Sequence, residues 1–328
     1  MFLRSIIVVL VSTSVLAAAG NVNVTIKEWD TPSANTHPHD TEIAPDGSLW
    51  YTGQYANLLG RLDPATGKIQ EFKLKTPDSG PHGLVADKDG NIWFTANNKA
   101  YIGKLDPKTG EIVEYPMPDS AARDPHTPLF DRNGTLWFTV QQGNLVGRLD
   151  PKTGKVTLKQ SPTPRSNPYG LRMDSKGDPW YCEFGSNKIA HIDPNTMDIK
   201  EYVLPEGARP RRFAIAANDL IYYSDHQRGY LGRLDPKTGK VDEWPSPGGP
   251  SSRPYAIAAL PDGTIWYSES NVTPNTMVRF DPKDNSFMTW PIPSGGKVLR
   301  HFVVNKEGTK IYIASSGANK VGIVEISK

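Results

Sequence analysis

The sequence predicts an all-β protein: a seven-bladed β-propeller with four-stranded blades, whose last blade is closed by the N-terminal strand. Three observations support this fold class. A unit of about 43 residues recurs along the chain, a period typical of propeller blades. Each unit contains four β-prone runs separated by turn signals. The last unit lacks its fourth run, whereas the first run of the mature chain belongs to no unit.

An aromatic residue on the second strand marks every unit. These aromatics are Trp50, Trp93, Trp137, Trp180, Tyr222, Trp266 and Tyr312. Pairs such as Asp89-Gly90 precede them and predict tight hairpins, because both residues tolerate positive φ. After the third strand comes Asp-Pro-x-Thr-Gly, as in residues 106–110, which predicts an exposed turn.

The two ends of the chain predict a closed ring. Residues 320–323 form the third strand of the last unit, and no fourth strand follows. Residues 24–29 end in Glu28-Trp29, as fourth strands do elsewhere in the chain. We therefore expect Trp29 to lie beside Val321, because closure protects the sheet edges. The alternative is an open array or a β-sandwich with a stray tail.

The N-terminus predicts export. Arg4 precedes an apolar run over residues 5–16, too short to span a bilayer, and Ala17 to Ala19 suit a cleavage site. Residues 1–19 are thus predicted as a signal peptide and 20–328 as a single propeller domain, periplasmic or secreted, without membrane insertion after cleavage. An uncleaved anchor is the alternative. The lone Cys182 cannot form an intrachain disulfide and is predicted to be a buried, unreactive thiol.

Charge and repeat pattern also limit the partners. The chain has 37 Lys and Arg against 35 Asp and Glu, a net charge of +2. This balance excludes the basic footprint of a nucleic-acid-binding protein. The predicted partner is a small molecule at the mouth of the central channel, bound by a monomer.

The repeat motifs resemble those of the virginiamycin B (streptogramin B) lyase family, the Vgb-like propellers. The resemblance rests on Pro81-His82-Gly83, on Trp93-Phe94-Thr95 and its counterpart at residues 137–139, and on residues 144–148, and it covers nearly the whole mature chain. It implies a lyase that opens a cyclic depsipeptide at its ester, using Mg²⁺ and a general base.

The resemblance also implies where the catalytic groups should lie. The family has a His opening blade 6, an acid-x-His pair opening blade 7 and a Glu after the second strand of blade 7. Here those positions carry Tyr255, then Leu299 with His301, and Ser315 or Ser316. Of the set, His301 alone matches, as the implied general base.

The residues themselves predict a site at one mouth of the channel. The position 11 residues before each marker aromatic opens the first strand, and these openings should converge. They are His39, His82, His126, Tyr169, Arg211, Tyr255 and His301. A second ring, three residues after each aromatic, should bring Glu183, Asp225 and Glu269 to face Arg211.

Roles follow from these residue types. His39, His82, Tyr169, Arg211, Tyr255, Glu183, Asp225 and Glu269 are predicted to bind the ligand. His39, His82, His126 and His301 are candidate metal ligands, for Mg²⁺ by resemblance or for a transition metal through imidazole. His301 and His126 are candidate bases, and Asp124, two residues before His126, repeats the family's acid-x-His pair on another blade.

Three functions are consistent with these residues. One is an exported streptogramin-lyase-like enzyme, with possible metal assistance, acting on an ester, lactone or sugar-acid ligand. Another is a non-catalytic binding or scaffold propeller, in which the histidines bind backbone and the acids pair with arginines. The third is a His-cluster metalloprotein.

Overall fold

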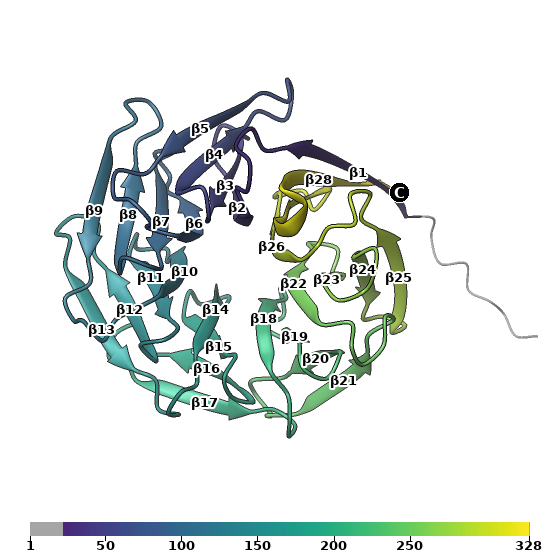
Figure 1. Cartoon of the computed structure of the whole chain (residues 1–328). Helices are drawn as coiled ribbons and strands as arrows, with labels where there is room; N and C mark the ends of the chain where they lie inside the picture. Colours follow the sequence, from purple (N-terminus) through teal and green to yellow (C-terminus); the bar gives the residue numbers. More distant parts are fainter. Residues whose placement is uncertain (1–21, 328) are drawn as a thin grey trace, which may run out of the picture.

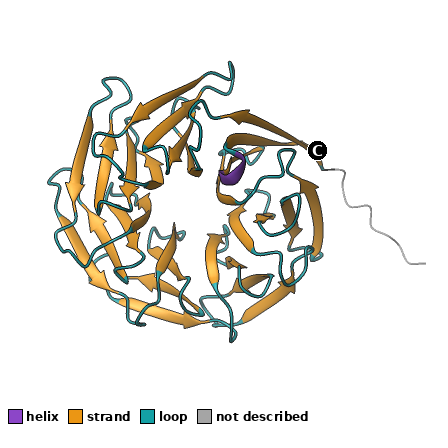
Figure 2. Ribbon diagram, viewed as in Figure 1, coloured by secondary structure: helices purple, strands orange, loops and turns teal. Residues whose placement is uncertain are grey.

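The computed structural model describes residues 22–327 and shows a closed ring of seven four-stranded antiparallel sheets around a central channel (Figure 1). Strands make up nearly all of its regular structure, apart from the short 3₁₀ helix η1 (Ser316–Ala318) (Figure 2). The predicted fold class is therefore confirmed. The predicted signal peptide, residues 1–19, lies outside the described residues. Within the described residues, no helix has the length and apolarity to cross a membrane.

Each blade places its first strand against the channel and its fourth strand at the rim. Blade 1 comprises β2 (Pro38–Ile43), β3 (Leu49–Gly53), β4 (Leu58–Leu62) and β5 (Ile69–Lys73); blade 2 comprises β6 (Pro81–Ala86), β7 (Ile92–Ala96), β8 (Tyr101–Leu105) and β9 (Ile112–Pro116); blade 3 comprises β10 (Pro125–Phe130), β11 (Leu136–Val140), β12 (Leu145–Leu149) and β13 (Val156–Gln160); blade 4 comprises β14 (Pro168–Met173), β15 (Pro179–Glu183), β16 (Lys188–Ile192) and β17 (Ile199–Val203).

The remaining blades complete the ring. Blade 5 comprises β18 (Pro210–Ile215), β19 (Ile221–Asp225), β20 (Tyr230–Leu234) and β21 (Val241–Pro245); blade 6 comprises β22 (Pro254–Ala259), β23 (Ile265–Glu269), β24 (Thr276–Asp281) and β25 (Ser286–Pro291); blade 7 comprises β26 (Leu299–Val304), β27 (Lys310–Ser315), β28 (Lys320–Ser327) and β1 (Asn23–Asp30).

Blade 7 is closed by the N-terminal strand, as predicted. Strand β1 pairs with β28 over its whole length, and Trp29 lies opposite Val321 (Figure 1). One face of β1 packs on the core, since Val24 and Ile26 contact a cluster that includes Ile311 and Val324. The fourth strand of blade 7 therefore comes from the N-terminal part of the chain, whereas its other three strands come from the C-terminal part.

Neighbouring blades are joined by a polar side chain on the second strand of blades 1 to 6. In every blade the first strand has a register shift, as between Pro81 and Leu84, which releases backbone groups from the ladder. In blade 2, Thr95 Oγ1 accepts the freed N–H of Gly83 at 2.9 Å and donates to the carbonyl of His126 on the next blade at 2.7 Å. Thr52, Thr139, Cys182 and Ser224 make the same pair of contacts. These contacts hold the opening residue of each following blade in place.

Cys182 is thus one of these joining residues. The thiol is fully buried and donates to the carbonyl of Arg211 at 3.2 Å. Burial raises its pKa to about 12, so the reactive thiolate does not form near neutral pH. A buried thiol is what the sequence predicts.

Candidate functional site at the channel mouth

Seven side chains, one from each blade, meet at one mouth of the channel. Each follows the residue that opens its first strand, and together we call them the mouth ring: His39, His82, His126, Tyr169, Arg211, Tyr255 and Arg300. Four of the rings follow one another at close range, each tilted by 44–47° to the next. The centroids of His39 and His82 are 3.7 Å apart, those of His82 and His126 3.8 Å, and those of His126 and Tyr169 3.9 Å.

Tyrosines and arginines complete the mouth ring. The hydroxyl groups of Tyr169 and Tyr255 are hydrogen-bonded to each other. The guanidinium of Arg211 lies 3.9 Å from the ring centroid of Tyr255 and 4.9 Å from that of Phe184, a cation–π arrangement. Arg300 donates from Nε to Ser316 Oγ at 3.0 Å. The mouth is therefore imidazole-rich on blades 1 to 3 and cationic on blades 5 and 7.

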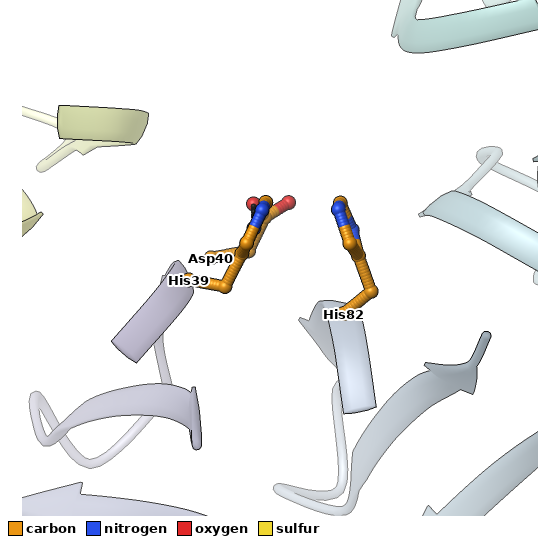
Figure 3. A group of neighbouring side chains, drawn as sticks. All are labelled: His39, Asp40 and His82. Atoms are coloured by element: carbon orange, nitrogen blue, oxygen red, sulfur yellow. Dashed lines mark hydrogen bonds and ion pairs between the residues drawn. The ribbon is translucent and has the colours of Figure 1, made fainter. Parts of the chain in front are cut away.

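A buried ion pair lies one residue further along the first strands. Arg212 Nη2 donates to both carboxylate oxygens of Asp40, at 2.8 and 3.0 Å, although the two residues belong to blades 5 and 1. His39 Nδ1 lies 2.9 Å from Asp40 Oδ1, and Figure 3 shows His39, Asp40 and His82 pointing the same way from β2 and β6. Burial opposes ionisation of Asp40, but the Arg212 guanidinium holds the pKa of that carboxyl well below its usual range. The pair links opposite sides of the channel beneath the mouth ring.

The expected position of His301 is wrong by one residue. Leu299, not Arg300, pairs with the end of its second strand, as Pro38 does in blade 1. Arg300 therefore occupies the mouth ring, and His301 lies one layer deeper, level with Asp40 and Arg212. The cause is the hairpin of blade 7. Six residues separate the paired Val304 and Ile311, against five between Ile43 and Leu49, so counting 11 residues back from the aromatic stops one residue short of Arg300.

The expected second ring of acids does not face the channel. Glu183 and Glu269 share strand faces with Tyr181 and Tyr267, because side chains alternate along a strand. Each carboxylate turns to the blade interior, where Ser161 and Ser246 respectively contact both the tyrosine and the acid. Asp225 pairs with Arg228 rather than with Arg211. All three acids are buried, and their contacts are those of structural residues.

The mouth opens into a polar cavity of about 330 Å³. Arg211, Arg300, the three ring histidines and Tyr169 contribute to its floor, and the second-strand loops contribute amide side chains. These amides belong to Gln54, Asn97, Asn98, Gln141 and Gln142. On the rim, His37 and Tyr55 stack at 4.0 Å, and the Tyr55 side chain is exposed. The cavity therefore offers hydrogen-bond donors, an aromatic surface and two cations.

Sequence reasoning overlooked several of these residues. His37, Gln54, Tyr55 and Asn97 precede a first strand or follow a second strand, where the repeat varies between blades. Their position in the repeat could have indicated them, because in a propeller these loops border the same mouth as the first residues of the first strands. Such loop residues carry function more often than their variability suggests.

Among the described residues that line this cavity, Asp124 is the one that has a carboxylate. Its backbone has φ 66°, and it accepts a hydrogen bond from the Asn97 side-chain amide. Burial raises its pKa to about 6, against the opposing effect of the Asn97 contact. A carboxyl with this pKa is part ionised, part protonated close to neutral pH, which suits a general base.

His126, the other member of the predicted acid-x-His pair, is in a different state. It is buried between His82 and Tyr169, and its Nδ1 lies 3.0 Å from Thr127 Oγ1. Burial first, and Arg212 second, lower its pKa well below 6.5. His39 reaches a pKa of about 3 for the same principal reason. The ring histidines are therefore neutral at pH 7 and poor proton acceptors.

The described residues do not fit a magnesium ion at this mouth. Mg²⁺ requires several oxygen ligands in octahedral geometry, whereas Tyr255, Leu299 and Ser315 supply no carboxylate on blades 6 and 7. His39, Asp40 and His82 have donor atoms within 4.8 Å of one another, the arrangement of a transition-metal site (Figure 3). However, Arg212 already engages both oxygens of Asp40. A metal would have to displace a buried guanidinium from its carboxylate, which is costly.

The fold and this mouth define a closed propeller with a polar cavity on its axis. The chain belongs to the virginiamycin B lyase family, whose model matches residues 15–234. A streptogramin B lyase structure has 28% identity and a TM-score of 0.83, covering 93% of this chain and 98% of that one. Selenomethionine-substituted virginiamycin B lyase from Staphylococcus aureus has 26% identity and a TM-score of 0.84, covering 92% and 99%. No curated protein sequence matches the chain.

A third structure shows such a propeller with a ligand. It is a catalytically inactive variant of the Staphylococcus aureus virginiamycin B lyase with quinupristin, with 25% identity, a TM-score of 0.84, and coverage of 92% of this chain and 99% of that one. These likenesses extend over almost the whole of each chain. They agree with the family that the matching model assigns to this chain.

Proposed function

We propose that this protein is an exported carbon–oxygen lyase that acts at the channel mouth on a small carboxylate ligand of the sugar-acid type. One observation carries the proposal: Asp124, with a pKa of about 6, shares a single polar cavity with Arg211 and Arg300. Family membership supports lyase chemistry, and the predicted signal sequence supports export. The amides around the cavity match the hydroxyl groups of a sugar acid.

The reaction would be an elimination. Arg211 and Arg300 bind the ligand carboxylate, which withdraws charge and acidifies the adjacent C–H bond. The Asp124 carboxylate takes that proton, the C–H electron pair forms a carbon–carbon double bond, and the bond to the β-oxygen breaks. The departing oxygen takes a proton from water. No step requires a metal.

Within this proposal the candidate roles predicted from sequence change. Asp124 replaces His126 and His301 as base, because both histidines are buried and neutral. His39, His82, Tyr169 and Tyr255 form the floor under the ligand, and Arg211 stays a ligand-binding residue. Glu183, Asp225 and Glu269 act as structural residues.

The test is a screen of uronic acids and their glycosides for formation of an unsaturated product, followed by ultraviolet absorbance. Asp124→Asn should reduce kcat by about 10²- to 10⁴-fold, the contribution of a general base, while leaving ligand affinity within a few-fold. Arg211→Gln should instead weaken binding. Prior dialysis against a chelator should leave activity unchanged. An Asp124→Asn protein as active as wild type would refute the proposal.

The alternative with structural support is a binding propeller without catalysis. Apart from Arg211 and Arg300, the mouth ring consists of neutral imidazole and phenol side chains, and two of these, Tyr169 and Tyr255, are hydrogen-bonded to each other rather than left open to a substrate. If sugar acids bind, depend on Arg211 and remain chemically unchanged, the binding function holds and the lyase function fails.

A further inference from the structure

The channel has a second cavity beyond the ion pair, toward the other end of the first strands. It measures about 310 Å³ and lies among residues that follow Asp40 and His301 along their strands. Whereas the mouth-ring cavity is polar, this one has apolar walls, which include Leu84, Leu129 and Phe302. Ala214 and Ala258 supply small side chains on blades 5 and 6, and so leave space there.

Two charged side chains interrupt the apolar wall. Arg172 projects from blade 4 and Glu42 from blade 1, at matching positions of their first strands. Arg172 donates to the Leu171 carbonyl at 2.9 Å, and its Nη2 lies 3.4 Å from His301 Nε2. Within the described residues neither contact is with a carboxylate, and two of the five guanidinium N–H groups are used.

The neutral state of His301 leaves Arg172 as the cation of this cavity. His301 Nδ1 lies 3.1 Å from the carbonyl oxygen of Thr41, to which it must donate, so Nε2 accepts from Arg172. Burial lowers the pKa of His301 to about 3 and that of Arg172 to about 10, which leaves the guanidinium charged at neutral pH. Asp40, which also borders the cavity, is committed to Arg212.

Among the described residues, Glu42 forms neither an ion pair nor a hydrogen bond with Arg172. Its Oε1 accepts the N–H of Ile43 at 2.9 Å. Burial raises the pKa of Glu42 to about 7, so a large share of the carboxyl groups is protonated at neutral pH and can donate to an anion. The cavity thus combines a half-buried cation, a carboxylic acid able to donate, and apolar walls.

We propose that this cavity is a second ligand site, which binds a small monocarboxylate with an apolar body. The carboxylate pairs with Arg172, the half-buried cation that contacts no carboxylate among the described residues, and the apolar body fills the space beside Ala214 and Ala258. The site is separate from the mouth-ring cavity, since the Asp40–Arg212 pair lies between them. It therefore takes a class of ligand that the polar mouth does not favour.

The test uses hexanoate, with hexanol as the uncharged probe of similar shape, in calorimetric titrations of the whole protein. Hexanoate should bind at least tenfold more tightly than hexanol. Arg172→Met, which keeps the packing of the side chain, should weaken hexanoate at least tenfold and leave hexanol within twofold. Arg172→Lys, which keeps the charge, should retain part of the preference for hexanoate if Arg172→Met folds poorly.

Three further variants locate the site. Arg211→Met, at the other cavity, should leave hexanoate binding unchanged. Glu42→Gln, which keeps the size and hydrogen-bonding capacity of the side chain, should bind hexanoate at least as well as wild type. Ala258→Leu should exclude both probes by filling the space. Equal affinity for hexanoate and hexanol, or loss of hexanoate binding in Arg211→Met and not in Arg172→Met, would overturn the proposal while leaving the lyase function untested by these probes.

Discussion

At the scale of single residues, the channel interior is dominated by groups whose charge is set by burial. Asp40 and Arg212 are charged because each forms an ion pair with the other. Within the described residues, His39 alone of the nearby histidines contacts an acid, which is Asp40, and burial still lowers the pKa of His39 to about 3. Asp40 should therefore contribute more to stability than an aspartate in an exposed ion pair does, such as Asp46 with Arg61. A buried carboxylate that neutralises a buried guanidinium cannot be replaced by water.

Asp40→Asn should lower the free energy of unfolding by about 3–5 kcal/mol, because it leaves the buried Arg212 guanidinium unpaired. Urea denaturation measures the change. The matched control is Asp46→Asn, which removes the partner of Arg61 at an exposed site and should cost at most about 1 kcal/mol. The double variant Asp40→Asn with Arg212→Met should recover part of the loss. Equal losses in the two single variants would contradict the assigned role.

At the scale of the elements, the blade-joining hydroxyl groups explain how seven separate sheets bring their side chains into register. The first strand of each blade is bulged, and its freed N–H needs a partner. In blades 1 to 6 a small hydroxyl or thiol on the second strand supplies that partner and also reaches the next blade. The mouth ring is therefore positioned by contacts that lie behind it.

Thr95→Val, which keeps the shape and removes the hydroxyl, should lower the free energy of unfolding by about 2–3 kcal/mol. The reason is that the Gly83 N–H and the His126 carbonyl lose their buried partner. Thr95→Ser restores the hydroxyl and should cost about 1 kcal/mol. Chemical denaturation of both variants, with ligand titration of the mouth, checks this. A Thr95→Val protein no less stable than Thr95→Ser would rule the joining role out.

The closing strand β1 invites a second test at this scale. Ile26 packs on the core and Lys27, the next residue, is exposed on the opposite face. Ile26→Asn should destabilise the protein by about 1–2 kcal/mol through lost apolar burial, whereas Lys27→Asn should have little effect. Thermal unfolding of the pair measures the difference. Similar midpoints for both would show that β1 adds little to the ring.

At the scale of the whole molecule, buried histidines make stability depend on pH. Burial lowers the pKa of His39 and His301 to about 3 and that of His82 and His126 well below 6.5. In the unfolded chain these groups titrate near 6.5. Below that pH the unfolded state binds more protons, so stability falls as pH decreases from 6.5 toward 3. Glu42 and Glu183, with pKa values raised to about 7, and Asp124, with a pKa raised to about 6, have the opposite effect but are fewer than the four histidines.

His82→Gln should therefore make the protein less sensitive to acid. Removing one histidine should reduce the slope of unfolding free energy against pH by about 1.4 kcal/mol per pH unit between pH 4.5 and 6. Denaturant titrations at several pH values give both slopes. Above pH 7.5 the slopes of wild type and variant should coincide. Identical slopes at pH 5 would mean that His82 is protonated in the folded state.

The fold could be predicted from sequence because its evidence is repeated. Seven markers such as Trp93, with the same turns after each, determine the blade number, and the unmatched run ending at Trp29 determines the closure. The site was harder, because it depends on features that occur once. A single added residue between Val304 and Ile311 placed Arg300 where His301 was expected. The inward turn of Glu183 toward Ser161 depends on strand faces in the folded blade, which spacing alone does not give.

The pairing of β1 with β28 also determines the order of events during synthesis. Among the described strands, β1 is synthesised first and its partner β28 last, so blade 7 is completed only after the strands of the other six blades have been made. Until β28 has been synthesised, strand β1 has an unpaired edge that another copy could occupy. A premature stop anywhere before Lys320 would consequently remove the partner of the strand that was made first.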